Sequence, residues 1–384
     1  MRAALVCDEF YPDIGGAPHY AFELSLQLVK SGVEVVVITH GHPAQPEEEE
    51  IEGVNIRRLK GLVLSNPHRA ASPLIFRHCH RYVLDGGFDV VHGLDVYSSM
   101  ALIVTVFAHR QKIPCILTCH TVMGSDAAIL WQRPLLGWSV KRADRIIAVS
   151  RAAAHFCRVL GVREARIAVV PNGVDLSCFN GAADASAIRG ALGIGNEPVV
   201  MTASRLVKRK NPELLVSAFA KVLRAVPEAR LVIAGSGRER EKVSRQVDSL
   251  DIAGSVLMLG ELPKEKVAQL MKASSVFVLS SKMESFGLSL LEASAAGVPV
   301  VCSNAGGIPE IFQDGFNAVL YPPGDDDAMA EAIISVIRDK DLAKKLSANA
   351  MRTADGFTWS IAAERTLRVY EEVVRQRGPA RSHS

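Results

Sequence analysis

One stretch constrains the fold of this chain more than any other: residues 276–310, which read VFVLSSKMESFGLSLLEASAAGVPVVCSNAGGIPE. An apolar run is followed by a polar turn, by apolar residues at helical spacing, and by a second apolar run that ends at a glycine pair. The spacing predicts a strand, a helix and a second strand, a unit typical of parallel sheets. Open sheets of this kind bind ligands at the carboxyl ends of their strands, so we expect the loop before the helix to lie at a binding site.

The same stretch carries two carboxylates eight residues apart, Glu284 and Glu292. The backbone amides of Phe286, Gly287 and Leu288 would lie at the start of the helix, where a phosphate binds readily. Glu292 would stand roughly 7–8 Å from that start, within reach of the ribose of a bound nucleotide. Glu284 would lie nearer the group attached to the phosphates. The structural alternative is a surface acid at Glu284 and a helix-stabilising one at Glu292.

The alternation of short apolar runs with helical segments recurs along the chain. Further strands are expected at residues 2–7, 33–39, 54–59, 89–92, 114–119, 145–149, 167–171, 198–203, 230–234, 255–259 and 318–321. The acidic run at 47–50 is expected to be a solvated loop, and 384 residues are too many for one ordinary core. We predict an α/β protein with two doubly wound domains, at residues 1–180 and 197–360. A helix in residues 361–384 is predicted to pack back on the first domain.

The composition excludes several classes of protein. A net charge of +3 is too small to indicate a nucleic-acid partner. Seven cysteines without a CxxC pair or metal-ligand spacing favour a reducing, cytoplasmic setting rather than a disulfide framework or a metal site. No apolar run approaches the roughly 18–20 residues that a membrane helix needs. The acidic run Asp325–Asp327 is expected to cap a helix, with a metal site as its alternative.

Three more polar features follow predicted strands. Gly15–Gly16 follows the first strand, where adjacent glycines allow either the close approach of a ligand or a tight turn with positive φ. His120 ends the strand CILTCH and is either a functional group or a satisfied structural histidine. The loop Ser204–Lys210 holds four cations, Arg205 and Lys210 among them, which would neutralise a diphosphate or simply form a solvated loop. Gly235–Gly237 lacks the third glycine of a dinucleotide fingerprint, because Arg240 stands in its place.

Taken together, several motifs resemble those of a known family. The chain resembles the retaining family 4 glycosyltransferases, which have the GT-B fold. ESFGLSLLE fits the E-x7-E signature of that family and SRLVKRKN fits its basic loop. AVSRA, VVPNGVD and YPPGD fit three of its other motifs. The match covers nearly the whole chain. Within that family, YPDIGG, VVVITHGHP and SRLVKRK look most similar to the branch that adds N-acetylglucosamine to phosphatidylinositol.

The resemblance implies a fold and a mechanism. The fold would be GT-B, with two Rossmann-like domains facing across a cleft, an acceptor-binding domain followed by a nucleotide-sugar-binding one. Arg205 and Lys210 would bind the diphosphate of a UDP-sugar, and Glu284 would face the donor sugar. His120 would hydrogen-bond that sugar near the reacting centre. The remaining donor-binding residues would be Gly15, Gly16, Phe286, Gly287, Leu288 and Glu292. No metal or other cofactor would be required.

The acceptor is less constrained than the donor. Many family members have an acid two residues after the glycine pair, whereas this chain has Pro18. Residues 69–82 and 131–145 mix basic and aromatic side chains, which would suit either a membrane surface, with phosphatidylinositol as acceptor, or ordinary amphipathic helices. Two other functions remain as alternatives: a nucleotide-sugar epimerase or phosphorylase of the same fold, and a non-catalytic nucleotide-sugar-binding protein.

Overall fold

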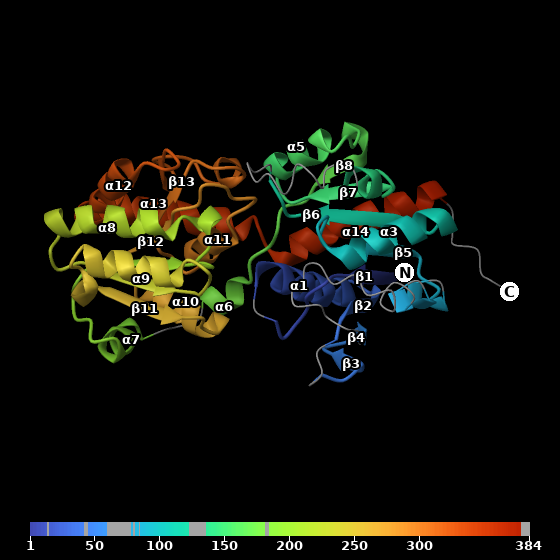
Figure 1. Cartoon of the computed structure of the whole chain (residues 1–384), viewed down its shortest axis with the longest axis horizontal. Coiled ribbons are helices and arrows are strands. Elements are labelled where there is room, and N and C mark those ends of the chain that lie inside the picture. Colours follow the sequence, from blue (N-terminus) through green and yellow to red (C-terminus); the bar gives the residue numbers. More distant parts are fainter. Residues whose placement is uncertain are drawn as a thin grey trace. The chain divides into compact units, whose positions relative to one another are not determined.

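The computed structural model describes residues 1–13, 15–41, 45–59, 78–79, 81–83, 85–122, 136–180 and 184–377. They form two compact units (Figure 1). The first contains the described residues of 1–172 and 359–384, and the second contains those of 173–358. Each unit has its own sheet and its own buried core, which are described separately below.

The first unit is built on an eight-stranded sheet in the order β3-β4-β2-β1-β5-β6-β7-β8. Its strands are β1 (Arg2–Val6), β2 (Glu34–His40), β3 (Glu48–Ile51), β4 (Val54–Leu59), β5 (Val90–Gly93), β6 (Cys115–Cys119), β7 (Arg145–Ala148) and β8 (Ile167–Val169). All pairings are parallel except that of β3 with β4. Runs such as AALV in β1 are apolar throughout because both faces of a parallel sheet are covered.

Helices cover both faces of this sheet. Ala3 and Leu5 of β1 face a core that includes α1 (Gly16–Lys30) and α14 (Trp359–Arg377). Their neighbours Ala4 and Val6 face the opposite core, which includes α3 (Ser99–Gln111). A further helix, α5 (Arg151–Val159), lies between β7 and β8 in the chain. The helix α14 therefore completes the core of the first unit, although the whole second unit separates it from that unit in sequence. The sequence predicted a helix in this region.

Most of the acidic run at 47–50, expected to be a loop, lies instead in the edge strand β3: Glu48–Glu50 belong to the strand and Glu47 precedes it. Its antiparallel pairing with β4 places Glu48 opposite Arg57, and the two side chains form an ion pair. Glu49, which stands opposite Ile56, reaches diagonally to the buried guanidinium of Arg58. Cross-strand charge pairs of this kind stabilise a strand whose own composition does not favour one.

The second unit is a six-stranded parallel sheet in the order β11-β10-β9-β12-β13-β14. The strands are β9 (Val199–Ala203), β10 (Arg230–Ala234), β11 (Val256–Gly260), β12 (Val276–Leu279), β13 (Val300–Ser303) and β14 (Val319–Tyr321). Its helices are α6 (Leu176–Asn180), α7 (Ala185–Ala191), α8 (Pro212–Ala225), α9 (Arg240–Ser249), α10 (Lys264–Lys272), α11 (Leu288–Ala295), α12 (Asp326–Arg338) and α13 (Lys340–Asp355). The two doubly wound units confirm the predicted α/β class.

The described part of the predicted linker, residues 180–196, is not a free connection. Arg189 of α7 donates hydrogen bonds to the carbonyls of Gly195 (2.7 Å) and Ala273 (2.8 Å), which tie α7 to the second unit. Asp175, just before α6, forms an ion pair with Lys264 of α10 at 3.5 Å. The boundaries of the compact units consequently lie at 172/173 and 358/359, whereas the sequence placed them near 180–197 and 360.

The strand order reverses at the centre of each sheet, between β1 and β5 in the first unit and between β9 and β12 in the second. At such a point the loops after the two central strands diverge to opposite faces and leave room for a ligand. The loops concerned carry most of the polar residues singled out from the sequence. Among the described helices, none has the length and apolar character needed to cross a membrane.

Candidate active site

The loops after β9 and β12 are joined at the switch point of the second sheet. The loop after β9 contains the predicted basic residues and ends in a short 3-10 turn, Lys208–Lys210. Ser280, directly after β12, donates a hydrogen bond from its hydroxyl to the carbonyl of Lys210 at 2.8 Å. The amide of Lys282 donates to the carbonyl of Arg209 at 2.8 Å. The two loops therefore hold one another in place through hydrogen bonds to backbone carbonyls.

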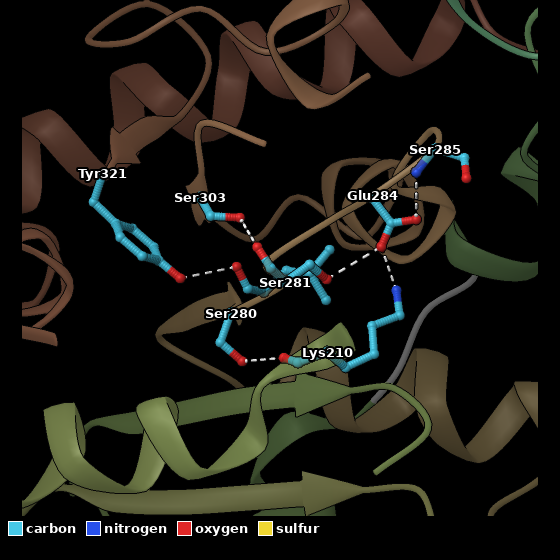
Figure 2. Close-up of polar contacts among 8 residues, drawn as sticks. Lys210, Ser280, Ser281, Glu284, Ser285, Ser303 and Tyr321 are labelled. Atoms are coloured by element: carbon cyan, nitrogen blue, oxygen red, sulfur yellow. Dashed lines mark hydrogen bonds and ion pairs between the residues drawn. The ribbon is translucent and has the colours of Figure 1, made fainter. Parts of the chain in front are cut away.

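An ion pair between Lys210 and Glu284 lies at the centre of this arrangement (Figure 2). The side chains of Lys210 and Glu284 are only 13% and 9% exposed. The carboxylate of Glu284 also accepts hydrogen bonds from the Ser281 hydroxyl (3.2 Å) and the Ser285 amide (3.1 Å). Burial by itself raises the pKa of Glu284, but the charge and hydrogen bond of Lys210 outweigh it, so that the pKa lies below its ordinary value. Glu284 is thus a buried carboxylate held in its charged form.

Two buried hydroxyl groups bond to the backbone before Glu284, and the sequence analysis did not predict them. Ser303, at the end of β13, donates to the carbonyl of Ser281 at 2.6 Å, and Tyr321, at the end of β14, donates to the carbonyl of Leu279 at 3.2 Å (Figure 2). Both are the last residues of their strands, and nothing in the local sequence distinguishes them from ordinary core side chains. Their bonds position the backbone of the loop that carries Glu284.

Glycines let neighbouring loops come close to this site. A Cβ atom on Gly306 would lie 1.9 Å from the carbonyl oxygen of Glu284, and the residue has a φ of +58°. Similarly, Cβ atoms on Gly235 and Gly237 would lie 2.0 Å and 2.3 Å from the carbonyl oxygens of Ser204 and Leu206. Gly235 and Gly237 therefore allow the backbone to pass close to the basic loop. This role does not need the third glycine of a dinucleotide fingerprint.

The predicted phosphate site at the start of α11 is formed by a left-handed turn. Gly287 has a φ of +88° and precedes the helix, and no described side chain caps this end. Phe286 is buried, with its ring edge-on to that of Phe357 at 6.1 Å between centroids. Leu288 begins the helix and Glu292 lies half-buried one turn further along. Arg205 is exposed on the basic loop of the same unit.

The other three predicted residues, Gly15, Gly16 and His120, lie in the first unit. Gly15 precedes α1 with extended backbone and Gly16 begins the helix, so neither adopts the positive φ of a tight turn. An added Cβ on Gly16 would meet no described atom within 4 Å, which leaves room for a ligand to approach. One turn into α1, the ring of Tyr20 lies edge-on to the ring of His120, at 4.3 Å between centroids.

His120 directly follows β6 and is held as a neutral ring. Burial lowers the pKa of His120 to about 4, against the smaller opposing effect of a hydrogen bond to the carbonyl of Leu94. Nε2 of the ring is buried and has no hydrogen-bond partner among the described residues, so we assign the donating hydrogen to Nδ1. A lone pair on Nε2 is then available to accept a hydrogen bond from a hydroxyl group.

The acidic run at 325–327 has a structural role in this chain. Asp325 caps α12, as predicted, by accepting a hydrogen bond from the amide of Ala328 at 2.9 Å. Lys221 forms ion pairs with Asp326 and Asp327. This run is the one group of three acids close enough to suit a metal ion within the described ranges, and its carboxylates already have these partners.

Much of the predicted membrane-facing sequence, residues 69–82 and 131–145, falls outside the described residues, so that expectation stays a prediction. The described part includes Trp138, which is 45% exposed. The guanidinium of Arg142 lies over its ring, 3.4 Å from the centroid.

Comparisons with known proteins agree with the fold and the motifs. Residues 184–353 match the model of the glycosyl transferases group 1, and residues 14–177 match that of glycosyltransferase family 4. The chain is 30% identical to D-inositol 3-phosphate glycosyltransferase of Kineococcus radiotolerans, over 96% of this chain and 93% of that one. It is 26% identical to a phosphatidylinositol N-acetylglucosaminyltransferase subunit of Arabidopsis thaliana, over 98% and 83%.

Solved structures give the same result for the fold. Sucrose-phosphate synthase of Thermosynechococcus elongatus superposes with a TM-score of 0.83 at 24% identity, over 98% of this chain and 99% of that one. HepE of Anabaena, in complex with UDP-glucose, gives 0.82 at 20% identity, over 97% and 100%. The paired Rossmann-like units are those of the GT-B class of glycosyltransferases. Since the family models and the relatives together span nearly the whole chain, this protein belongs to family 4 of the glycosyltransferases and is an enzyme of that class.

Proposed function

We propose that this enzyme is a retaining, metal-independent glycosyltransferase that takes its sugar from a nucleotide-diphospho-sugar, with UDP-N-acetylglucosamine as the first candidate. The second unit binds the donor and the first unit binds the acceptor, a lipid-linked or small polar molecule. The observation that carries this proposal is the buried Lys210–Glu284 ion pair at the switch point of the second sheet. Glu284 is also the first glutamate of an intact E-x7-E motif, whose second is Glu292.

The donor is bound largely by charge and by backbone amides. Arg205 and Lys210 bind the diphosphate, and the start of α11 contributes the amides of residues 286–288. Glu292 binds the ribose hydroxyls, and Glu284 orients Lys210 while facing the sugar. Gly15 and Gly16 allow the chain to approach the phosphates and sugar closely, and His120 accepts a hydrogen bond from a sugar hydroxyl.

Transfer proceeds on one face of the sugar. The bond between the anomeric carbon and the phosphate oxygen breaks, a hydroxyl oxygen of the acceptor forms a new bond to the same carbon from the same side, and the acceptor proton passes to the departing phosphate. Arg205 and Lys210 stabilise the negative charge that develops on the leaving diphosphate, the part that a bound cation would otherwise play.

The relatives suggest the donor and acceptor to be tried first. Two of them carry an inositol phosphate group in their names, as D-inositol 3-phosphate or as phosphatidylinositol. N-acetylglucosamine occurs in the name of the Arabidopsis protein and in that of N-acetyl-alpha-D-glucosaminyl L-malate synthase of Bacillus anthracis, which is 27% identical over 91% of this chain and 91% of that one. We accordingly expect the transfer of N-acetylglucosamine to an acceptor with an inositol phosphate group.

A two-step screen tests the proposal. UDP-, GDP- and ADP-sugars are first compared by thermal shift, in which a bound donor raises the melting temperature. The best donor is then incubated with phosphatidylinositol vesicles, inositol phosphate or L-malate, and the product is identified by mass spectrometry and its anomeric configuration by NMR. Inversion of configuration contradicts retention. Epimerisation of the donor without an acceptor supports the epimerase alternative, and binding without any turnover supports the non-catalytic one.

A further inference from the structure

A chain of buried polar side chains runs through the first unit, from its last helix to its first. The hydroxyl of Tyr370, on α14, lies 2.7 Å from Nδ1 of His92 on β5. Nε2 of the same ring lies 2.7 Å from the hydroxyl of Thr118 on β6, which in turn lies 3.4 Å from the hydroxyl of Tyr20 on α1. None of the four residues is more than 4% exposed.

This chain of hydrogen-bonded side chains ends beside the ring of His120. The ring of Tyr20 is edge-on to His120, and the ring of Trp359, the first residue of α14, lies near Tyr20 at 5.8 Å between centroids. Thr118 and His120 are also two residues apart at the end of β6. The helix α14 thus contributes one side chain to each end of the polar chain, through Trp359 and Tyr370.

All members of the chain are uncharged at neutral pH. Burial, together with the smaller effect of the nearby His120, lowers the pKa of His92 to about 3. Burial raises the pKa of Tyr20 to about 12, although its hydrogen bond with Thr118 opposes the rise. A neutral His92 can donate from one ring nitrogen and must accept at the other. His92 therefore donates to one of Tyr370 and Thr118 and accepts from the other.

Each hydroxyl in the chain depends on its neighbours. A buried hydrogen-bonding group left without its partner costs about 1–3 kcal/mol, so removal of one member forces the remaining rings to move or to find other partners. Tyr20 is the member in ring contact with His120, and a change in its position passes directly to that ring. A misplacement of about 1 Å at a reacting centre can lower a rate by about 100-fold.

We propose that Thr118, His92 and Tyr370 are positioning residues for sugar transfer, which hold the Tyr20 ring against His120 and so fix the direction in which Nε2 of His120 is presented. This proposal rests on the function proposed above for His120. It makes the C-terminal helix α14 part of the support of the active site, since Tyr370 begins the chain of hydrogen bonds.

Substitutions at Thr118 separate positioning from plain stability. Thr118→Val keeps the volume of the side chain and loses its hydroxyl, whereas Thr118→Ser keeps the hydroxyl and loses a buried methyl group. We expect kcat to fall about fivefold to tenfold in Thr118→Val, with the donor KM within about twofold, and to recover in Thr118→Ser even though that variant contains a small cavity. If Thr118 matters only for packing, activity follows melting temperature in both variants.

A second pair of variants lies on α14. Tyr370→Phe removes only the hydroxyl that bonds to His92, and we expect about the same loss of kcat as in Thr118→Val. Its control is Thr366→Val, one turn earlier on the same helix, where a buried hydroxyl bonds to the carbonyl of Ala362 at 2.8 Å, within the helix itself. Thr366→Val should lower stability without lowering kcat.

The ring nitrogen signals of 15N-labelled His120 give a readout that does not depend on activity. We expect them to move in Thr118→Val and Tyr370→Phe and to stay in place in Thr118→Ser and Thr366→Val. If the wild-type enzyme transfers sugar but Thr118→Val and Tyr370→Phe are as fast, positioning is wrong and the proposed function stands. If the wild-type enzyme transfers none, the proposed function is wrong, and unchanged His120 signals in the two variants would overturn the positioning as well.

Discussion

The two units differ in the polar side chains at the ends of their central strands. In the second unit, the loops after β9 and β12 are joined by a buried ion pair, Lys210 with Glu284. In the first unit, the corresponding region around β5 and β6 holds the neutral side chains of His92, Thr118 and His120. One site is built around fixed charges, and the other keeps titratable groups uncharged by burial.

In the proposed function, this difference corresponds to two kinds of ligand group. A diphosphate carries negative charge and gains more as it leaves, so preorganised cations stabilise it most. Sugar hydroxyls are neutral, and a neutral imidazole with a free lone pair orients them without the cost of burying a charge. The pairing of Lys210 with Glu284 also keeps the lysine in place before a donor arrives, because a lone ammonium at that depth would be costly.

The largest effect is expected from Lys210→Ala, which removes the cation of the charged site. Sugar transfer should fall by about 10²–10³-fold, because the leaving diphosphate loses a preorganised partner. Lys221→Ala serves as a control, since Lys221 is also paired with carboxylates of the second unit, to Asp326 at 3.0 Å, but away from the proposed site. Steady-state rates of both variants are compared with the wild type. Near-normal transfer by Lys210→Ala would rule out its role on the leaving group.

Next in size is the effect of Gly306→Ala, which forces the loop after β13 away from Glu284. An alanine Cβ would overlap the Glu284 carbonyl oxygen at 1.9 Å, so we expect a loss of about 3 kcal/mol in the free energy of unfolding and weaker donor binding. Gly315→Ala is the matched control, with a φ of +67° but no atom within 4 Å of its Cβ, and should cost only about 1 kcal/mol. Urea unfolding and donor KM measure the two. Equal losses in both variants would mean that the close contact is unimportant.

Acid should distinguish the two sites. At pH 5 each buried histidine should lower the free energy of unfolding by about 2 kcal/mol relative to neutral pH. The pKa values of His92 and His120 are lowered to about 3 and about 4, from 6.5. Their contribution to stability is therefore present above pH 6.5 and decreases as the pH falls toward 4. The pKa of Glu284 lies below its ordinary value of 4.5, so its contribution is lost only at lower pH.

Hydrogen exchange at pH 7.5 and pH 5, corrected for intrinsic rates, measures this difference. Protection should decrease at residues 115–119 of β6 and remain at residues 276–279 of β12. Equal loss of protection in both strands, or earlier loss in β12, would contradict the contrast between a neutral and a charged site.

The smallest effect is expected from a chelator. Because cations of the protein replace a metal ion in the proposed mechanism, EDTA should change the rate of transfer by less than about twofold. Loss of activity in EDTA, with recovery on addition of Mg²⁺, would show that the charged site is incomplete without a metal ion.

Hydrophobic patterning was sufficient to predict the two doubly wound units and most of their strands. It failed at β3, where three glutamates in succession do not resemble a strand. There, the pairing with Arg57 and Arg58 depends on a partner strand that the local sequence does not reveal. It also placed the first boundary too late, because the contacts of α7 with the second unit come from Arg189 and its distant acceptors.

For the site, motif spacing selected Lys210 and Glu284, which the structure brings into contact. The residues behind them could not be found in this way. Ser303 and Tyr370 act through partners 22 and 278 residues away in sequence, Ser281 and His92, and nothing local distinguishes them from ordinary core side chains. Residue type and spacing thus identified candidate ligand-binding groups but not the side chains that hold them in place.

The return of the chain to the first unit through α14 has a consequence for synthesis. The second unit is continuous in sequence, residues 173–358, and can be completed while the chain is still being made. The first unit cannot, because Trp359, Tyr370 and Val373 belong to its core and are made after residues 173–358. We therefore expect the apolar face of α1 to lack its cover until α14 has been made, and truncation of α14 to leave the first unit prone to misfolding.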